Sequence, residues 1–378
     1  MVGDIVMTIV GAGVGNVATV PSWLDGANIT QTTARLSVDP ERADPQFISA
    51  VFQSSVGRRS IELFAKGAAQ PGLNLEHVRV FPVTLPPRDE QTKIAMFLDR
   101  ETSKIDTLVG EQRRLIELLK EKREAVISHA VTKGLNPNDP LKPSGIEWLG
   151  EVPEHWMTTS VRNLIRRQAL TMQDGNHGES HPKSSEYMPS GVPFLMAGDM
   201  GSAGIDLENC SFITEDRAAR LRIGPALPGD VLLSTKGAQL GEVAIIPERI
   251  DFPFIVLTPQ ITYYRVMTSE IDRGFLAFVL ESSVVQSQLW FHASIQATRP
   301  YVGLTAQREL FFALPPIDEQ RAIRKSLETK IGKLDILTSE AERGIELLQE
   351  RRAALISAAV TGKIDVCEFV SSQSSKSL

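Results

Sequence analysis

The sequence predicts an α+β fold in which two strand-rich domains are joined by two long helices that form an antiparallel coiled coil with pseudo-two-fold symmetry. The main observation is an internal repeat. The run LPPRDEQ at Leu85–Gln91 returns as LPPIDEQ at Leu314–Gln320, and EKREAVISHAVT at Glu121–Thr132 returns as ERRAALISAAVT at Glu350–Thr361. Both pairs have the same separation, which exceeds half the length of the chain and is far longer than the period of solenoid repeats. The chain therefore holds two copies of a whole domain-plus-helix unit.

The repeat continues upstream, where the two copies become unequal. The glycine-rich run Gly11–Ala18 matches Gly237–Ala244, and a Gly-Asp pair precedes each run. In the second copy Glu147–Pro228 stands before that pair, whereas only Met1 and Val2 do so in the first. We expect the first domain to be an N-terminally truncated copy whose sheet lacks strands. A shortened reading frame, or a missing part encoded elsewhere, would account for it.

The bulk composition is that of an ordinary protein of two to three domains, with 378 residues, 42% hydrophobic and 23% charged. A net charge of −6 argues against non-specific nucleic-acid binding as the main role, but allows a sequence reader with a local basic patch. Cys210 and Cys367 suggest no disulfide framework, so we expect a cytoplasmic protein. The apolar stretch 5–20 follows Asp4 and is broken by glycines, so it is a poor signal peptide and too short to span a membrane.

The predicted domain order follows from these patterns. We expect a partial first domain at 1–85, a long helix at 86–133, a turn-rich linker at 134–145, a second domain at 146–316, a second long helix at 317–362 and a flexible tail at 363–378.

Each long helix has start and stop signals. A Pro-Pro pair precedes it, acidic residues occupy its first turn, and Gly134 or Gly362 follows its end. About 44 residues at ~1.5 Å each give a rod of roughly 65 Å. Apolar residues repeat at heptad spacing and predict a coiled-coil seam between the two helices, although such heptads could instead tie a dimer together. The predicted seam is Leu98, Ile105, Leu108, Leu115, Leu119 and Val126 in the first helix, and Leu327, Leu334, Leu337, Leu348 and Leu355 in the second.

Between the helices the second domain alternates β-like runs with polar loops. The runs are Val192–Met196, Asp230–Ser234, Glu242–Ile246 and Gln260–Val266, and Phe275–Trp290 is a helical insert.

Three motifs could indicate chemistry, and in each case we favour a structural interpretation. Gly11–Gly15 resembles half of a dinucleotide fingerprint, but its second copy keeps only the outer glycines, which favours turn geometry. His177 and His181 lie in a polar loop with no further His or Cys nearby. Asn136–Asp139 lacks the aromatic that would stack a flipped base. The sequence therefore predicts no catalytic, cofactor or metal site on this chain.

Polar loops at matching places in the two copies are the candidates for contacting DNA. Side chains of these types bind phosphates or base edges. The predicted DNA-binding residues are Arg166, Arg167, Lys183, Lys236, Gln239, Arg299 and Tyr301 in the second copy, and Asn16, Gln70 and Asn74 in the first.

Taken together, these motifs resemble the specificity subunit of type I restriction–modification systems. The resemblance rests on the two Leu-Pro-Pro helix starts, the helix end at 123–134, the domain opener at Trp148–Trp156 and the strand at 228–237. It covers nearly the whole chain in family order.

The resemblance implies two target-recognition domains that each read half of a split site in double-stranded DNA. It also implies that two methylation subunits bind around the helices and supply S-adenosylmethionine, while restriction subunits add ATP- and Mg-dependent translocation and cleavage. This chain would be a non-catalytic reader without a cofactor of its own. The alternative is a coiled-coil scaffold that binds protein; an oxidoreductase built on the N-terminal glycines fails on the second copy.

Overall fold

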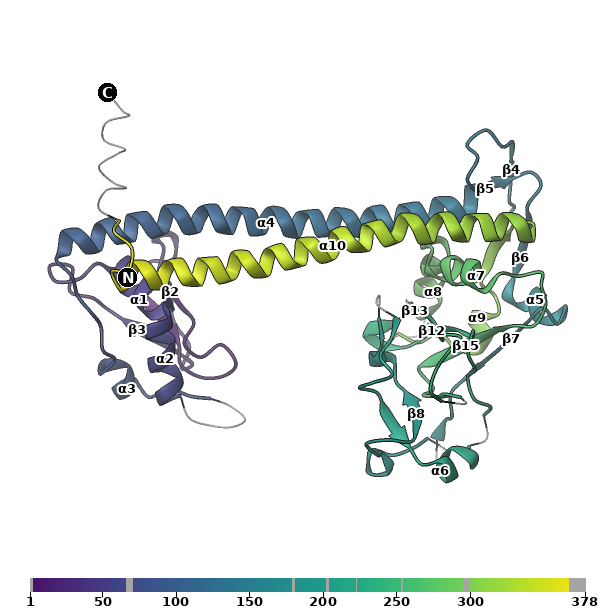
Figure 1. Cartoon of the computed structure of the whole chain (residues 1–378), viewed down its shortest axis with the longest axis horizontal. Helices are drawn as coiled ribbons and strands as arrows, with labels where there is room; N and C mark the ends of the chain where they lie inside the picture. Colours follow the sequence, from purple (N-terminus) through teal and green to yellow (C-terminus); the bar gives the residue numbers. More distant parts are fainter. Residues whose placement is uncertain are drawn as a thin grey trace. The chain divides into compact units, whose positions relative to one another are not determined.

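Figure 1 shows the computed structural model of the chain, which divides into two compact units. Unit 1 comprises Met1–Glu117 with Leu337–Leu378, and unit 2 comprises Leu118–Ile336. The structure describes residues 3–65, 71–178, 181–201, 204–221, 223–252, 254–294 and 300–366. It contains strand-rich regions and two long packed helices, which confirms the predicted α+β class.

Unit 1 is built on an antiparallel sheet of the order β2-β1-β3. Its core surrounds Ile5, Met7 and Phe47, whose side chains are fully buried. Asp44 accepts hydrogen bonds from two backbone N–H groups at the start of α1, and the Ser54 hydroxyl caps α2 by accepting one from the Gly57 N–H. Outside the long helices the elements are β1 (Ile5–Thr8), β2 (Val17–Thr19), η1 (Ser22–Leu24), β3 (Thr33–Leu36), α1 (Pro45–Gln53), α2 (Ser55–Phe64) and α3 (Leu75–Arg79).

The elements of unit 2 outside the long helices are more numerous. They are β4 (Leu141–Pro143), β5 (Glu151–Pro153), β6 (Met157–Ser160), α5 (Val161–Arg166), β7 (Leu170–Asp174), η3 (Ser184–Glu186), β8 (Val192–Leu195), η4 (Ala197–Asp199), β9 (Met200–Gly201), β10 (Gly204–Ile205), β11 (Ser211–Ile213), α6 (Glu215–Ala219), β12 (Val231–Ser234), η5 (Gly237–Gln239), β13 (Val243–Ile245), β14 (Val256–Leu257), β15 (Ile261–Val266), α7 (Arg273–Glu281), α8 (Ser283–Ser294), α9 (Leu304–Gln307) and β16 (Phe311–Leu314).

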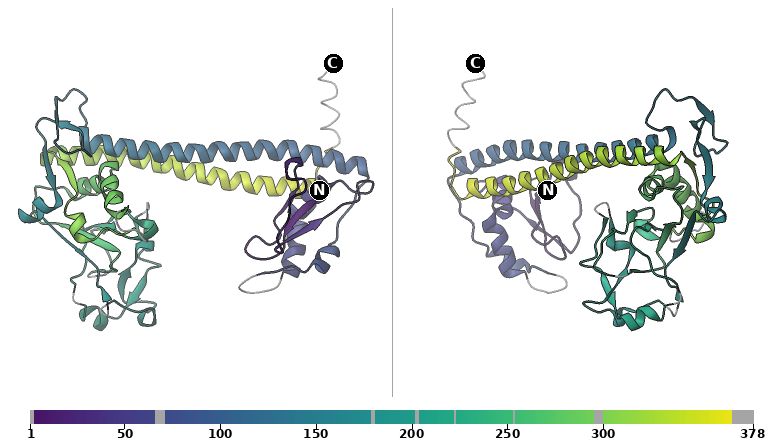
Figure 2. Two further views of the ribbon diagram at one scale, coloured as in Figure 1. Left: turned by 180° about the vertical axis from the view of Figure 1, so that it is seen from behind. Right: turned by 45° about the vertical axis from the view of Figure 1, so that its right-hand side comes forward.

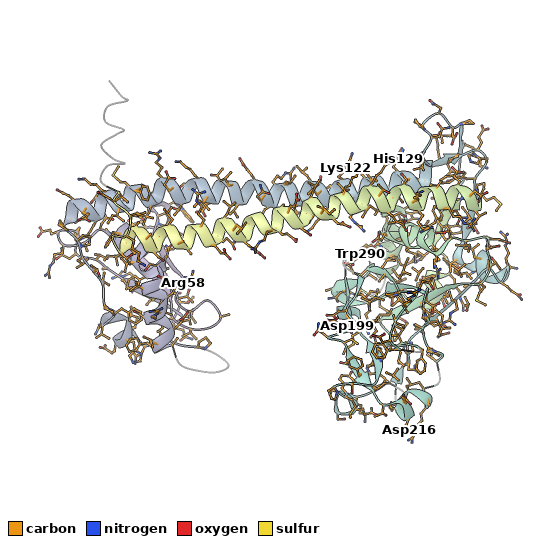
Figure 3. The ribbon with its side chains drawn as sticks, viewed as in Figure 1. Arg58, Lys122, His129, Asp199, Asp216 and Trp290 are labelled. Atoms are coloured by element: carbon orange, nitrogen blue, oxygen red, sulfur yellow. The ribbon has the colours of Figure 1, made fainter. Side chains whose placement is uncertain are left out.

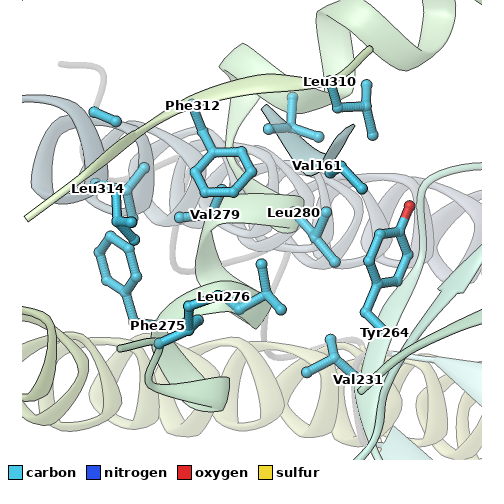
Figure 4. Packing of buried hydrophobic residues seen from close by; sticks show 14 of the residues in the cluster. Val161, Val231, Tyr264, Phe275, Leu276, Val279, Leu280, Leu310, Phe312 and Leu314 are labelled. Atoms are coloured by element: carbon cyan, nitrogen blue, oxygen red, sulfur yellow. The ribbon is translucent and has the colours of Figure 1, made fainter. Parts of the chain in front are cut away.

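The largest sheet of unit 2 is antiparallel, with the order β13-β12-β15-β7. A second sheet has the order β11-β8-β14, and β10-β9, β16-β6 and β4-β5 form pairs. All four predicted β-like runs therefore contain strands. One face of the largest sheet packs on α7 and α8 through Val231, Tyr264 and Phe275, which Figure 4 shows together. The predicted insert Phe275–Trp290 is two helices, because Ser282 ends α7 by donating its hydroxyl to the Val279 carbonyl at 2.6 Å.

The glycine-rich runs are hairpin turns between β1 and β2 and between β12 and β13. Gly11 and Gly15 have φ of +95° and +85°, and Gly237 and Gly241 have +79° and +95°. This left-handed region favours glycine, so the glycines shared by the two copies are the ones that the turn requires. The turn interpretation of Gly11–Gly15 is confirmed.

The two long helices are α4 (Arg88–Lys133) and α10 (Ile317–Val360). In unit 1 the start of α4 packs on the end of α10 through Leu98, Ile356 and Ala359. In unit 2 the end of α4 packs on the start of α10 through Ile127 and Leu327. The helices are therefore antiparallel within each unit, and Figure 2 shows them side by side from two further directions. Within the described residues, every helix is too short or too polar to cross a lipid bilayer.

The glutamine of the repeated LPPxDEQ motif joins each long helix to its domain. Gln91 accepts a hydrogen bond from the Asp44 backbone N–H at 2.9 Å, and Gln320 accepts one from the Asp272 N–H at 2.9 Å. Each side-chain amide also donates to the first proline carbonyl of its own motif. Both glutamines are buried, so their pairing explains why both copies carry the motif.

The seam between the helices differs from the predicted one at three positions. Leu108, Leu115 and Leu337 are 44%, 42% and 46% exposed, so they lie outside it. Val109 and Ile116 are buried instead, because the chain uses the position four residues after Ile105 rather than three. Of the other predicted positions, Leu98, Ile105, Leu119 and Leu327 are buried, and Val126, Leu334, Leu348 and Leu355 are partly buried.

The same ion pair recurs in the helices of each unit. Arg352 donates to Asp106 at 2.9 Å in unit 1, and Arg123 lies 3.7 Å from Asp335 in unit 2. Each arginine and each aspartate is separated from its equivalent by the same interval as the repeated motifs. Arg123 also pairs with Glu281 at 3.1 Å, and the position that corresponds to Glu281 in unit 1 is Gln53.

The predicted linker at 134–145 contains a short strand. β4 pairs with β5, and the Glu154 backbone N–H donates to the Pro140 carbonyl at 2.8 Å. The prolines that indicated a linker lie at 137, 140 and 143, at or near the ends of this strand pair, where the missing N–H costs little.

Candidate nucleic-acid interface

A group of polar side chains lies at one end of the four-stranded sheet of unit 2. β7 and β12 both run antiparallel to β15, so their last residues, Asp174 and Ser234, lie at the same end of the sheet. Two loops are hydrogen-bonded at this end of the sheet. The Thr235 backbone N–H donates to the Gln260 carbonyl at 2.8 Å, and the Val302 N–H donates to Thr235 at 2.9 Å. With the pairing of β7 to β15, these bonds hold residues from four separate stretches of chain together.

Lys236 and Tyr301 face each other at this end of the sheet. The Lys236 Nζ lies 5.7 Å from the centre of the Tyr301 ring, and the two residues form an isolated β-bridge. Among the described residues, no carboxylate lies within ion-pair distance of Lys236, and both side chains are partly exposed. Burial, and secondarily the Asp174 carboxylate, raise the pKa of the Tyr301 phenol. Tyr301 is therefore neutral at physiological pH and able to donate a hydrogen bond.

Asp174 completes the group and is itself well satisfied. It is 6% exposed. The Gln173 side-chain amide donates to its Oδ1 at 2.9 Å, and the His177 Nε2 lies 2.7 Å from its Oδ2. His177 thus belongs to this group, whereas the His181 ring packs against Phe194 with centroids 5.4 Å apart. The two histidines of the predicted polar loop do not share a site.

The remaining candidates of unit 2 lie elsewhere. Arg166 ends α5 and Arg167 follows it, so both precede the start of β7 and lie at the far end of that strand from Asp174. Arg167 is also engaged, since it donates to Glu270 at 2.6 Å. Lys183 precedes η3, where its backbone N–H donates to Glu186 at 2.7 Å. Gln239 ends η5 in the same loop as Lys236.

The candidates of unit 1 form no comparable group. Asn16 is exposed in the hairpin turn, and the Asn74 side chain caps α3 by accepting from the Glu76 N–H at 3.1 Å. The positions that correspond to Lys236 and Tyr301 in the paired loops are Val10 and Gly72, which form the equivalent bridge. Gln70 and Arg299 lie outside the described residues.

The sequence analysis missed two members of the polar group, Gln173 and Asp174. Their signal was a polar pair that ends the strand just before Gly175, but only the tertiary pairing with β15 brings them beside the two loops. It also missed Trp290 of α8, which is half exposed (Figure 3) and offers an aromatic face to solvent.

A separate cluster in unit 2 has the composition of a metal site but is otherwise explained. Ligand atoms of Asp139, His155 and Glu319 lie within 4.8 Å of one another. His155 Nε2 and Trp156 Nε1 both approach the same Glu319 oxygen, at 2.9 and 3.0 Å, and the Asn136 amide donates to Asp139 at 2.6 Å. These bonds fasten the domain opener to the first turn of α10, which explains the residues without an ion.

Comparisons with known proteins agree with the resemblance. No protein-family model matches the chain. It is 26% identical over 304 residues to the type I restriction enzyme MjaVIII specificity subunit of Methanocaldococcus jannaschii, covering 80% of this chain and 66% of that one. It is 23% identical over 285 residues to the EcoBI specificity subunit of Escherichia coli, covering 74% and 58%. The chain thus spans less than two thirds of the length of these curated relatives.

The fold agrees as well. A solved structure described as the structural basis of complex assembly and conformational transition of the type I R-M system superposes with a TM-score of 0.69 at 17% identity, covering 95% of this chain and 81% of that one. By sequence the chain is similar to specificity subunits of type I restriction enzymes, and it shares the fold of that solved structure.

Proposed function

We propose that this chain is a specificity subunit of a type I restriction–modification complex, which reads a bipartite site in double-stranded DNA and positions the subunits that act on it. Its curated relatives are named as specificity subunits of type I restriction enzymes. The chain would itself be non-catalytic and bind no cofactor. Two methylation subunits would carry S-adenosylmethionine, and restriction subunits would carry ATP and Mg.

The observation that supports DNA recognition is the polar group at the end of the four-stranded sheet of unit 2. Lys236 is a cation without a carboxylate partner among the described residues, and it lies beside the neutral phenol of Tyr301. A cation of this kind binds a phosphate, while the phenol and the Gln239 amide can bond to base edges. Arg166, Arg167 and Lys183 would then serve other contacts or none.

We further propose that unit 1 is a shortened recognition domain, with a sheet that lacks the counterpart of β7. The three-stranded order β2-β1-β3 corresponds to β13-β12-β15 in unit 2, and the described part of unit 1 adds no fourth strand. Recognition by unit 1 would then depend on fewer side chains than recognition by unit 2.

The exposed leucines of the long helices support partner binding. Leu108, Leu115 and Leu337 lie outside the seam and project into solvent. Leu118 and Leu347 are 44% and 49% exposed, and they occupy equivalent positions in the two copies of the repeat. Apolar side chains that recur in this way are suited to packing against helices of the methylation subunits.

Methylome sequencing tests the whole proposal. The chain is co-expressed with its neighbouring methylation subunit in a host that lacks its own modification. A bipartite motif with N6-methyladenine in both halves supports the proposal. A motif with one defined half would mean that unit 1 does not read DNA. Absence of both methylation and DNA binding would favour the protein-binding scaffold.

Substituting Lys236 tests the site. In the assembled methylation complex, Lys236→Gln should weaken binding to the methylome-defined DNA about fivefold and reduce the slope of log K against log salt by about 1. Lys142→Gln is the control, because Lys142 lies on β4, outside the four-stranded sheet, and its Nζ donates to the Glu154 carbonyl. Equal losses in the two variants would contradict the assignment.

A further inference from the structure

In unit 2, the loop that follows β7 is fixed by two residues. Gly175 lies so close to the backbone of Leu257 that a Cβ atom at this position would overlap it. Asn176 is 2% exposed, and its side-chain oxygen accepts a hydrogen bond from the Ile223 backbone N–H at 3.1 Å. The next residue, His177, therefore follows a segment of backbone that is held in place by its surroundings.

The His177 ring is oriented by the Asp174 carboxylate. Its Nε2 lies 2.7 Å from Asp174 Oδ2, and the Gln173 side-chain amide donates to Asp174 Oδ1 at 2.9 Å. A carboxylate accepts hydrogen bonds and cannot donate them, so the ring proton faces Asp174 from Nε2, and Nδ1 of the neutral ring is an acceptor. The His177 side chain is 53% exposed, and no described residue donates to its Nδ1. The fold thus presents a hydrogen-bond acceptor of fixed character to solvent.

This acceptor belongs to a group that otherwise offers donors. The Lys236 ammonium can only donate hydrogen bonds, and the neutral Tyr301 phenol donates one. The Gln239 amide can turn to present either its oxygen or its nitrogen, so it imposes no preference on a ligand. His177 Nδ1 differs from that amide, because Asp174 sets which hydrogen-bonding role it has.

The edges of DNA bases differ in whether they can donate to such an acceptor. In the major groove the donors are the N6 amine of adenine and the N4 amine of cytosine, whereas guanine and thymine present acceptors. A guanine or thymine oxygen that faced Nδ1 would bring two acceptors together and leave both without a proton. The donor groups nearby are satisfied by acceptors of the same base pair, such as adenine N7 or the guanine O6 beside cytosine.

We propose that His177 is a specificity-determining residue, whose Nδ1 accepts a hydrogen bond from the exocyclic amine of an adenine or a cytosine in the DNA target. Asp174 is its positioning residue, because it fixes the tautomer and the direction of the ring. This inference rests on the proposed DNA-reading role of unit 2, and it adds the chemical class of base that is read.

The test removes single amines from the DNA. Duplexes of the methylome-defined site carry purine in place of one adenine, or 2-pyrimidinone in place of one cytosine, at each position in turn. Binding is measured with the assembled methylation complex. In the wild type, loss of the amine that His177 contacts should weaken binding about tenfold, because Nδ1 loses its donor. In His177→Ala the same deletion should have no further effect, while deletions at other positions keep theirs. The base at which this coupling occurs distinguishes adenine from cytosine.

Three variants separate reading from folding. Asp174→Asn places an amide that can also donate opposite Nε2, so the tautomer is no longer fixed and the coupled deletion should lose most of its effect. His177→Asn keeps an acceptor oxygen near the place of Nδ1 and should retain part of the effect. The control is Asp216→Asn, which alters an aspartate of α6 that is 75% exposed (Figure 3) and should leave every deletion effect unchanged.

Three results would overturn the proposal. Deletion effects that are all retained in His177→Ala would show that His177 contacts no base amine. A uniform loss of affinity in that variant, with every deletion effect unchanged, would assign His177 a role in folding or in phosphate binding. A wild-type complex that does not distinguish its site from unrelated DNA would refute the proposed function, and this inference with it.

Discussion

The two copies share their construction and differ at their sheet ends. Both have the same hairpin, the same capped helix pair and the same glutamine that joins the long helix to the domain. They differ where Lys236 and Tyr301 of unit 2 correspond to Val10 and Gly72 of unit 1, and where β7 has no counterpart among the described residues. The framework is repeated, whereas the side chains suited to contacting a ligand are not.

The largest expected effect is the loss of stability when a buried aromatic side chain is removed, and it should be equal in the two units. Phe47 and Phe275 occupy the same position in α1 and α7 and are both fully buried. Changing either to alanine should destabilise its own unit by about 3–5 kcal/mol, through lost burial and the cavity that remains. Denaturant-dependent hydrogen exchange, read separately for each unit, measures this. A large effect in one unit only would break the equivalence of the cores.

The equivalent aspartates Asp230 and Asp4 should differ in how much stability is lost when the hydrogen-bond partner of each is removed. Arg265 donates to both oxygens of Asp230, which is 2% exposed, at 2.9 and 2.8 Å. Arg265→Ala should destabilise unit 2 by about 3 kcal/mol, because a buried carboxylate loses its partner. In unit 1, Ser37 donates to Asp4 at 2.7 Å, and Ser37→Ala should cost about 1 kcal/mol. The same exchange measurement would refute the contrast if the two losses were equal.

The Ser37 bond also predicts a dependence on pH. It lowers the pKa of Asp4 below its ordinary value of 3.8, so the stability that it contributes is present above that value and is lost as the pH falls through the lowered pKa. In Ser37→Ala the folded-state pKa of Asp4 should lie nearer its ordinary value, so the pH-dependent part of this stability should be smaller. Acid unfolding of unit 1, followed by exchange at β1, provides the check, and unchanged acid unfolding would contradict it.

The smallest expected effect concerns Glu281, the carboxylate that pairs with Arg123. Burial, opposed by Arg123, raises the pKa of Glu281, so its ionised form is the less favourable one in the fold. Stability from this group is present at low pH and declines as the pH rises through the raised pKa. Glu281→Gln, which copies Gln53 of unit 1, should remove that decline and change stability at pH 7 by less than about 1 kcal/mol. Strong destabilisation at pH 7 would show instead that the ion pair dominates.

The sequence alone predicted the features that depend on local or repeated patterns. The hairpin glycines, the strands β8, β12, β13 and β15, and the helix starts after Pro-Pro each follow from backbone conformation or from apolar periodicity. The repeated motifs placed the glycine-rich hairpin and the long helix in two copies without any structure.

The tertiary structure decided which polar residues meet. Lys236 and Tyr301 were both candidates, but Arg166 and Arg167 lie at the other end of β7, and Asp174 joined the group only through its pairing with β15. The seam shows the same limit, because heptads starting from Leu98 and Ile105 are compatible with either Leu108 or Val109. A sequence pattern gives the period of an element, whereas the face that is buried, and the strand ends that lie together, depend on what packs against it.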